Sequence, residues 1–433
     1  MKTKLAAGTF ALGVLAWGSA AHAGAPTPFT DDLFVDFNGL RNELRDLGVD
    51  IRFGYTSETA TNAQGGEHEG VTYDDQLTFG IGLDLQKLFA IDQAKIQMSI
   101  TDRNGQSLSS VEDLHSLQQV QEIYGRGQTW LLTQFWYDQK YAGGILDWKI
   151  GRLTEGEDFA AFSCDFMNLT FCGAQPGNLV GNYWYNWPIS QWGTRFKVNI
   201  AHFGYVQIGG FVANPSYLQQ RYAFDFGNPP GATGALLPVE VGWLPTFGAG
   251  LDGSYKFGAW YNTSEQNDVF ENTAGQPLVL AGGKPLERHG SYGEYINFLQ
   301  RVTGSAGSSQ GLSVFLNATA ADRRTSALDK QVNAGLFETG LFAGRPLDKL
   351  GFAIGGTHVN SRIAAAERLQ DAVGGDSVPV PVQGSEYVAE IFYGATLAPW
   401  IELRPNIQYV RHPGGTSQYT DDVIVGLKLS TNF

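Results

Sequence analysis

The chain has few charged residues, few cysteines and almost no long apolar stretch. Asp, Glu, Lys and Arg make up 17 % of its 433 residues, whereas soluble domains average about 25 %. Its single long apolar run covers residues 5–20, so no transmembrane helix is predicted after that point. None of the seven histidines is followed by another at i+4 spacing, and no metal site is therefore predicted.

Two further observations argue against nucleotide and nucleic-acid binding. Residues 248–253 match the G-x-G-x-x-G pattern, but a strand-like segment follows them, and a dinucleotide site requires a helix there. The formal net charge of −14 gives a long-range field that disfavours nucleic acid as a partner. We therefore predict no cofactor and no nucleic-acid partner.

The first residues are typical of a secretory signal peptide. Lys2 and Lys4 precede the apolar run, and Ala21-His22-Ala23 follows it as a small-x-small cleavage pattern. We predict that residues 1–23 are removed after export.

Residues 24–48 have a different pattern from the rest of the mature chain. Leu40, Leu44 and Leu47 fall on one face of a helix, and acidic residues come before them. This predicts a short amphipathic helix in a periplasmic segment that precedes the first strand.

The end of the chain alternates between two kinds of side chain. One face would carry Val423, Val425, Leu427, Leu429, Thr431 and Phe433, and the other Asp422, Ile424, Gly426, Lys428, Ser430 and Asn432. A membrane barrel needs an apolar lipid face and a polar lumen face, with aromatics at the interfaces. A soluble sandwich also alternates, but the terminal Phe favours the barrel. We expect this strand, through Phe433, to be recognised by the barrel assembly machinery.

The same alternation recurs along the chain and predicts the fold class. Candidate strands begin near Val49, Gln76, Lys95, Trp130, Leu146, Gln191, Gly204, Val239, Leu251, Tyr292, Gly311, Lys330, Lys349, Ser385, Trp400 and Asp421. About 16 strands enclose an aqueous channel. We predict an all-β protein with one transmembrane antiparallel β-barrel over residues 49–433, and long extracellular loops at 213–236, 263–291 and 361–384.

Residues 183–192 concentrate aromatic side chains beside amides. Tyr183, Trp184, Tyr185, Trp187 and Trp192 lie close to Asn and Gln residues there. Sugars stack their C–H faces on aromatic rings while amides bind their hydroxyls. Trp and Tyr also line membrane interfaces, and the residues alone favour neither interpretation.

Several motifs resemble the OprB family of carbohydrate-selective porins. They are Gly151-Arg152-Leu153, Asp158-Phe159, the C-x7-C block of Cys164 and Cys172 with Asn168 and Phe171, the Trp-Pro-x-Ser-Gln-Trp-Gly run at 187–193, Gly209 with Asn214-Pro215, and Gly39-Leu40-Arg41-x-x-Leu44-x-x-x-Gly48. The resemblance covers nearly the whole mature chain. Departures from the family pattern are Asp36-Phe37-Asn38, where Asp-Trp-Gly is expected, and Gln207, where a basic residue is more usual.

The resemblance implies a channel that is narrowed by inward-folded loops and passes sugars. We place the constriction loop around residues 152–192. By position, the resemblance puts these residues in or beside the constriction or in its wall: Arg152, Asp158, Asp165, Asn168, Trp187, Gln191 and Trp192.

Strand alternation supplies a second set of lumen residues independently of the resemblance. These are Arg52, Lys149, Arg195, Lys197, Glu390, Glu402 and Arg404. Charges of both signs offer charge-assisted donors and acceptors to sugar hydroxyls, whereas a ring of one sign selects ions. The alternative for each residue is an ordinary solvated lumen charge.

Cys164 and Cys172 are the only cysteines in the chain. An even pair in an exported protein predicts one disulfide. The closed loop is short, so its stabilisation is about 2–3 kcal/mol, and its main effect is to fix the shape of the loop.

Together these patterns predict a passive porin in the outer membrane of a Gram-negative bacterium. We expect it to admit monosaccharides or small oligosaccharides, to contact outer-membrane lipid and to have no enzyme activity; the sequence leaves a homo-oligomer open. One alternative is a general or weakly ion-selective porin. Another is an outer-membrane barrel hydrolase, for which His202 is the one candidate catalytic histidine.

Overall fold

The residues that alternate in the sequence lie on the outer and inner faces of the barrel wall. On the last strand, Val425 and Leu427 are 45 % and 40 % exposed, whereas Ile424 and Lys428 are buried. Directly paired residues of neighbouring strands share a face, so the same division continues around the barrel. The outer face is apolar and the inner face is mostly polar.

The computed structural model describes residues 39–248, 250–374 and 380–432. Its strands are β1 (Val49–Gln64), β2 (Val71–Asp84), β3 (Ala94–Gly105), β4 (Trp130–Tyr141), β5 (Leu146–Leu153), β6 (Gln191–Ile200), β7 (Gly204–Ala213), β8 (Gly234–Trp243), β9 (Thr246–Phe247), β10 (Leu251–Asn272), β11 (Pro285–Arg301), β12 (Gly311–Ala321), β13 (Leu328–Thr339), β14 (Lys349–Val359), β15 (Ser385–Ala398), β16 (Ile401–Arg411) and β17 (Asp422–Asn432).

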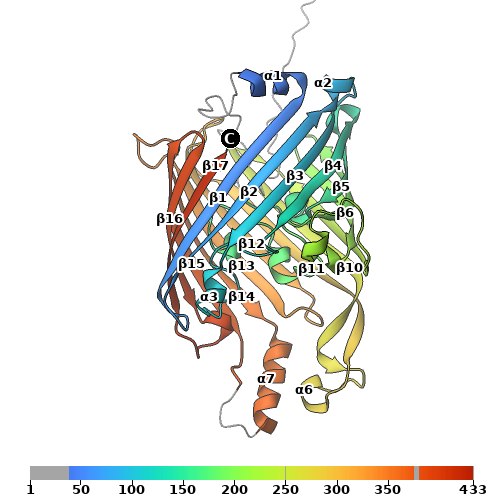
Figure 1. Cartoon of the computed structure of the whole chain (residues 1–433), viewed down its shortest axis with the longest axis vertical. Helices are drawn as coiled ribbons and strands as arrows, with labels where there is room; N and C mark the ends of the chain where they lie inside the picture. The colour runs from blue at the N-terminus through green and yellow to red at the C-terminus, as the bar shows by residue number, and fades with distance from the viewer. Residues whose placement is uncertain (1–38, 249, 375–379, 433) are drawn as a thin grey trace, which may run out of the picture.

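Every neighbouring pair of barrel strands is antiparallel, and β17 pairs with β1 to close the barrel (Figure 1). The two-residue β9 pairs only with the start of β10. Without β9 the closed barrel has 16 strands. The predicted fold class and strand number are therefore confirmed, and closure leaves no free sheet edge.

The helices and 3-10 turns lie at the ends of the barrel, inside it or, between β7 and β8, over its outer side. They are α1 (Leu40–Leu47), α2 (Leu85–Phe89), α3 (Leu108–Val111), α4 (Glu155–Asp158), α5 (Gln175–Leu179), α6 (Leu278–Ala281) and α7 (Ser361–Gly374), with 3-10 turns η2 (Ala142–Gly144), η3 (Leu169–Phe171), η4 (Pro215–Leu218), η5 (Gln220–Tyr222) and η6 (Pro413–Gly415). In the part of the chain that the structure describes, no helix is long and apolar enough to cross a membrane.

The two ends of the barrel differ in the length of their connections. Short turns, together with α1 and α2, occupy the end drawn at the top of Figure 1, while α6 and α7 project from the opposite end. Long connections follow β3, β5, β7 and β14 at that second end. We call these two ends the short-turn end and the long-loop end.

Two of the predicted extracellular loops contain regular structure. β10 and β11 extend into the segment 263–291, and α7 fills much of 361–384. The side-chain oxygen of Asn360 accepts a hydrogen bond from the N–H of Arg362 at 3.0 Å and so caps α7. Residues 361–384 do connect β14 to β15, as predicted, whereas the connection in 263–291 is shorter than predicted because β10 runs to Asn272 and β11 begins at Pro285.

The predicted N-terminal helix is present as α1. Gly48 ends it in the left-handed conformation (φ 103°). Arg41 is its buried residue and donates a hydrogen bond to the carbonyl of Ile51 at 3.1 Å, while Leu40 and Leu47 are exposed. The predicted signal peptide (1–23), the rest of the segment up to residue 38 and Phe433 lie outside the described residues.

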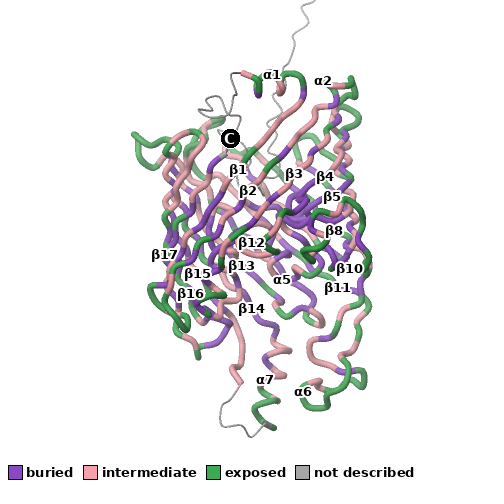
Figure 2. Tube along the Cα trace, in the orientation of Figure 1, coloured by how far each residue is buried: buried purple, intermediate pink, exposed green. Residues whose placement is uncertain are grey.

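The buried core lies inside the barrel. Figure 2 shows buried stretches on the strands and on the segments that fill the middle of the barrel. The largest fully buried side chains include Phe159, Phe166, Phe171 and Trp184, all on the connection between β5 and β6. The lumen is therefore largely filled by inward-folded chain.

Candidate functional site

Two connections fold from the long-loop end into the barrel. The first inner segment is residues 106–129, between β3 and β4, and the second is residues 154–190, between β5 and β6. They contact each other directly: the N–H of Glu122 donates to the carbonyl of Met167, and the N–H of Leu169 donates to that of Gln119, each at 2.9 Å. The second inner segment occupies the region predicted as the constriction loop.

A buried carboxylate on β15 fixes the middle of the second inner segment. The oxygens of Glu390 accept hydrogen bonds from the N–H groups of Met167 and Asn168, both at 2.8 Å. The side chain of Asn168 caps η3 through the N–H of Thr170 and also donates to Gln408 on β16. Asn168 therefore shapes and attaches the segment and is fully buried in doing so.

Asp165 attaches the same segment to the wall through two cations. Its carboxylate lies 2.8 Å from Nζ of Lys349 and 3.4 Å from Nη2 of Arg404. Glu402 holds the other side of Arg404, with Nε to Oε1 at 2.5 Å. Although burial opposes ionisation, Lys349 and Arg404 hold the pKa of Asp165 below its usual range.

A second ionic cluster attaches the beginning of the segment to β5 and β6. Asp158 lies 3.0 Å from Nζ of Lys149 and 3.7 Å from Nε of Arg195. Arg195 also contacts Asp147 at 2.6 Å and Asp138 at 3.2 Å. Burial raises the pKa of Asp158, but the cations outweigh it and leave that pKa lowered. Asp158 and Arg195 are thus predicted lumen residues whose charges neutralise each other.

Gln207, which departs from the family pattern, belongs to this attachment. Its amide donates to the carbonyl of Asp158 at 2.6 Å and to the carboxylate of Glu240 at 2.9 Å. A neutral donor therefore suffices here to hold the start of the second inner segment.

Aromatic packing also attaches the second inner segment to the barrel wall. The ring of Phe166 lies 5.0–6.1 Å, centroid to centroid, from those of Phe171, Phe315, Phe337 and Phe392. Such pairs contribute about 0.5–1.5 kcal/mol each beyond the area they bury. The second inner segment is thereby held against β12, β13 and β15.

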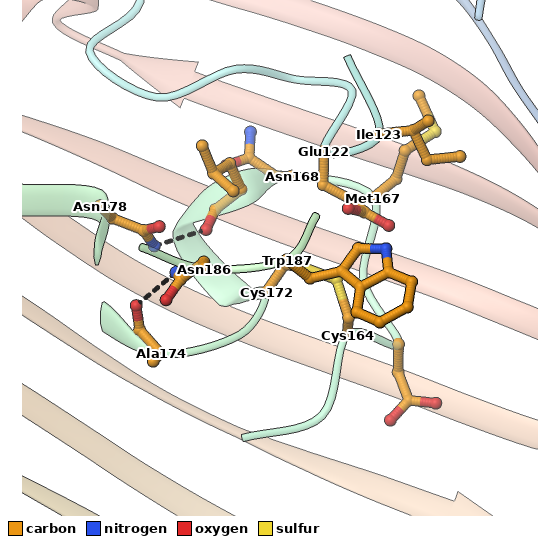
Figure 3. The surroundings of a disulfide bond; sticks show 12 residues. Glu122, Ile123, Cys164, Met167, Asn168, Cys172, Ala174, Asn178, Asn186 and Trp187 are labelled. Atoms are coloured by element: carbon orange, nitrogen blue, oxygen red, sulfur yellow. Dashed lines mark hydrogen bonds between the residues drawn. A yellow bond between two sulfur atoms is a disulfide. The ribbon is translucent and has the colours of Figure 1, made fainter. Parts of the chain in front are cut away.

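The two cysteines are joined within this segment. Cys164 and Cys172 form a disulfide with their Cα atoms 4.2 Å apart, as the cysteine pair predicts. Figure 3 shows the bond beside the indole ring of Trp187 and near Glu122. The disulfide closes a small loop that faces the remaining open space.

That open space, which we call the eyelet cleft, lies between the inner segments and β3. Its lining residues are Arg103, Glu122, Gly156, Glu157, Cys164, Leu169, Cys172, Gly173, Ala174, Asn186 and Trp187. The side-chain oxygen of Gln76 on β2 accepts hydrogen bonds from Nε of Arg103 at 2.8 Å and from the indole N–H of Trp187 at 3.0 Å. The cleft therefore presents one fixed cation, carboxylates and one flat ring.

Buried ion pairs hold the acidic side of the cleft. Nζ of Lys428 on β17 lies 2.7 Å from Glu122 and 3.1 Å from Glu58 on β1. An uncompensated buried charge is costly, so Lys428 balances two carboxylates that would otherwise repel each other. The first inner segment is thus attached where the barrel closes.

Arg152 and Trp192 do not face the lumen, although the resemblance implied that they lie at the constriction. They pair with each other across β5 and β6, and Arg152 also pairs with Phe135. Lys149 and Arg195 pair with each other three positions along the same two strands. Because three is an odd number, they lie on the opposite, inner face. The prediction that Arg152 and Trp192 lie at the constriction was wrong because the motif identifies their positions in the sequence but does not show which face of the strand each side chain takes.

The outer side of these two residues is covered by residues 214–227. Arg152 donates to the carbonyls of Ser190 (2.8 Å) and Asp225 and stacks on Tyr217. The indole N–H of Trp192 donates to the carbonyls of Phe226 and Gly227 at 3.0 Å. This segment folds back over the outside of β4, β5 and β6.

Replacing Arg152 with Leu should therefore lower stability without changing sugar flux. Two carbonyls lose a charged donor, which typically costs about 1–3 kcal/mol. Urea unfolding followed by tryptophan fluorescence measures the loss, and single-channel conductance measures the pore. An unchanged unfolding curve together with an altered conductance would contradict the outward placement.

Two further predicted residues, Arg52 and Gln191, also lie outside the eyelet cleft. Arg52 lies on the inner face of β1 toward the short-turn end, and its guanidinium contacts Asp50 at 2.6 Å. Gln191 begins β6, pairs with Leu153 and is fully buried. Of the predicted set, the cleft itself contains Trp187 and the disulfide.

The sequence prediction missed Arg103 and Glu122. Extending the alternation of Lys95, Gln97 and Ser99 along the same strand would have placed Arg103 on the lumen face. Glu122 follows no period because it lies in an irregular segment, and its contact with Lys428 spans 306 residues. Only the folded chain brings it to the cleft.

The chain is similar to known porins over nearly its full length. A family model described as carbohydrate-selective porin, OprB family, matches residues 68–433. Porin B of Pseudomonas aeruginosa is 41 % identical over 450 residues, which cover 100 % of this chain and 99 % of that protein. The putative porin QuiX of Acinetobacter baylyi is 33 % identical and covers 93 % of both chains.

Solved structures agree with the sequence comparisons. The high-pH structure of Pseudomonas putida OprB matches with a TM-score of 0.88 and 39 % identity, covering 92 % of this chain and 97 % of that one. The outer-membrane channel DcaP of Acinetobacter baumannii has a TM-score of 0.52 at 11 % identity, and that likeness concerns the fold alone.

Proposed function

Because the chain belongs to the OprB family of carbohydrate-selective porins, we propose that it passes small neutral sugars by diffusion through the eyelet cleft. The family and the fold are those of a channel rather than an enzyme. His202, the candidate for a hydrolase, lies in the turn between β6 and β7 at the short-turn end. No energy coupling is needed, since flux follows the concentration gradient.

The composition of the cleft is the observation that carries this proposal. Arg103 and Glu122, which carry opposite charges, both line the cleft, and Trp187 adds a flat apolar face. Sugar hydroxyls bind charged donors and acceptors, and C–H faces stack on indole. Such contacts must stay few, because conduction requires release as well as binding.

We place the protein in the outer membrane of a Gram-negative bacterium, with the short-turn end in the periplasm. Barrels of this class have short periplasmic turns and longer extracellular loops, which supports this orientation. A sugar then meets the inner segments from outside and leaves past Arg52 at the short-turn end. Recognition by the assembly machinery and association of copies stay predictions.

Liposome swelling with the refolded protein tests the proposal. We expect glucose to enter faster than an uncharged non-sugar of the same size, and Trp187→Ala to reduce that preference several-fold because stacking contributes about 1 kcal/mol. The matched control is Trp130→Ala, which removes an exposed indole from the outer wall and should leave the ratio unchanged. Equal entry rates for both solutes in the wild type would reduce the function to a general diffusion channel.

A further inference from the structure

A cluster of basic side chains lies on the outer face of the barrel at the long-loop end of β13 to β16. We define the rim patch as Arg323, Lys330, Tyr387, His358, Arg411 and His412. In strand register, Lys330 pairs with His358, His358 pairs with Ser385, and Tyr387 pairs with Arg411. Four consecutive strands therefore bring these groups together on one outward face.

The outward direction follows from the burial of their strand neighbours. Lys330 and Arg411 are exposed, whereas Gln331 and Val410 beside them are buried. Toward the middle of the barrel the same face continues with Val332, Ile354 and Ile407, which are 49–54 % exposed. The rim patch thus sits directly above the apolar belt that faces lipid.

An aromatic ring lies at the centre of the patch. Tyr387 is 52 % exposed, and its ring covers Gly356, where an added Cβ would meet ring carbons at 3.2 Å. The ring of His412 lies 6.4 Å away, edge-on. A flat exposed ring flanked by cations on both sides offers stacking to a sugar and ion pairing to a phosphate.

Two acids near the patch, Asp329 and Asp421, offset only part of its positive charge. Asp329 is buried and is occupied by His358 at 2.6 Å and Arg323 at 3.3 Å. Asp421 accepts hydrogen bonds from the hydroxyl of Tyr409 and the N–H of His412. Asp421 is close enough to Arg411 to interact with its charge, and Lys330 and Arg411 are both exposed at the membrane boundary, so the three cations of the patch exceed its two acids by one.

We propose that the rim patch binds the phosphorylated sugar head group of an outer-leaflet glycolipid. Lys330 and Arg411 pair with phosphate, and Tyr387 stacks on the sugar ring. The proposal rests on the orientation given under the proposed function, which puts the long-loop end in the outer leaflet. It is independent of which solute passes through the eyelet cleft.

Titration of the protein in neutral detergent with purified lipopolysaccharide tests this assignment. Each Lys or Arg near a charged lipid surface contributes about 1 kcal/mol, so Lys330→Gln combined with Arg411→Gln should weaken binding about 30-fold. The matched control combines Lys87→Gln at the short-turn end with Lys284→Gln on the hairpin between β10 and β11, and should bind like the wild type. Adding Tyr387→Ala to the Lys330→Gln and Arg411→Gln double variant should weaken the binding of lipopolysaccharide further.

Two additional binding measurements identify which part of the lipid the rim patch binds. Dephosphorylated lipopolysaccharide should bind the wild type as weakly as the double variant binds the intact lipid, and inorganic phosphate should not compete at millimolar concentration. Equal binding by wild type and double variant, effective competition by free phosphate, or a change of oligomeric mass in the variant would overturn the proposal. Sugar flux, measured in parallel, should not change in any of these variants.

Discussion

Replacing Asp165 with Ala should loosen the second inner segment and widen the pore. The change leaves Lys349 and Arg404 without their shared carboxylate. Breaking a buried ion pair costs about 3–5 kcal/mol, and the lower end applies because Lys349 is 31 % exposed. We expect a higher single-channel conductance and faster entry of oligosaccharides that the wild type excludes by size.

A matched control separates this effect from the loss of any acid. Asp252→Ala removes a carboxylate from the short-turn end, where it accepts a hydrogen bond from Thr246, and should leave conductance unchanged. Liposome swelling with a series of oligosaccharides measures the exclusion limit. If Asp165→Ala lowered the stability but kept the wild-type limit, the other attachments, through Glu390 and the phenylalanine cluster, would hold the segment unaided.

The pKa of Asp165 determines the pH below which protonation of this carboxylate should loosen the second inner segment, as Asp165→Ala does. Its folded-state pKa is below the unfolded value of about 3.9, so the stabilisation is fully present above that value. It is lost only as the pH falls through the lower folded-state pKa. We expect the exclusion limit to stay constant from neutral pH down to about pH 4.

The barrel could be predicted because its wall obeys one simple period. The position of a side chain in a strand predicts whether it faces lipid, as Val425 does, or the lumen, as Lys428 does. The same alternation occurs in each hairpin. The number of strands followed from this period and from turn residues, without any long-range contact.

The interior could be predicted only in part because it is built by irregular chain. Asp165 and Arg195 were placed correctly as inward groups, but their partners come from distant strands that no period connects. The motif that contains Arg152 did not predict which face of β5 its side chain takes. Neighbouring residues of a strand face opposite sides, and Arg152 lies at a position that faces the outer side. The attachment of the first inner segment through Glu122 and Lys428 had no sequence signal.

The charge balance of the eyelet cleft depends on a single guanidinium. Glu122, Asp74 and Glu58 are the carboxylates that act on Arg103, and Lys428 is already engaged with two of them. Together with Lys428, Arg103 leaves one excess negative charge among these groups, and its loss would leave two, so Arg103 limits the preference of the opening for cations. The sequence composition, with more acids than bases, does not show this local balance.

Replacing Arg103 with Gln should make the pore cation-selective. Removing one positive charge about 6 Å from a permeating ion lowers the energy of a cation and raises that of an anion by about 0.7 kcal/mol each, even at the dielectric constant of water. The two shifts differ by about 1.4 kcal/mol, so the cation-to-anion permeability ratio should rise about 10-fold. Reversal potentials in a KCl gradient measure this ratio. Arg52→Gln is the matched control, because the Arg52 side chain is 40 % exposed and water and salt screen its charge, and its ratio should stay near the wild-type value. An equal shift in both variants would mean that the whole lumen, rather than the eyelet cleft, sets ion selectivity.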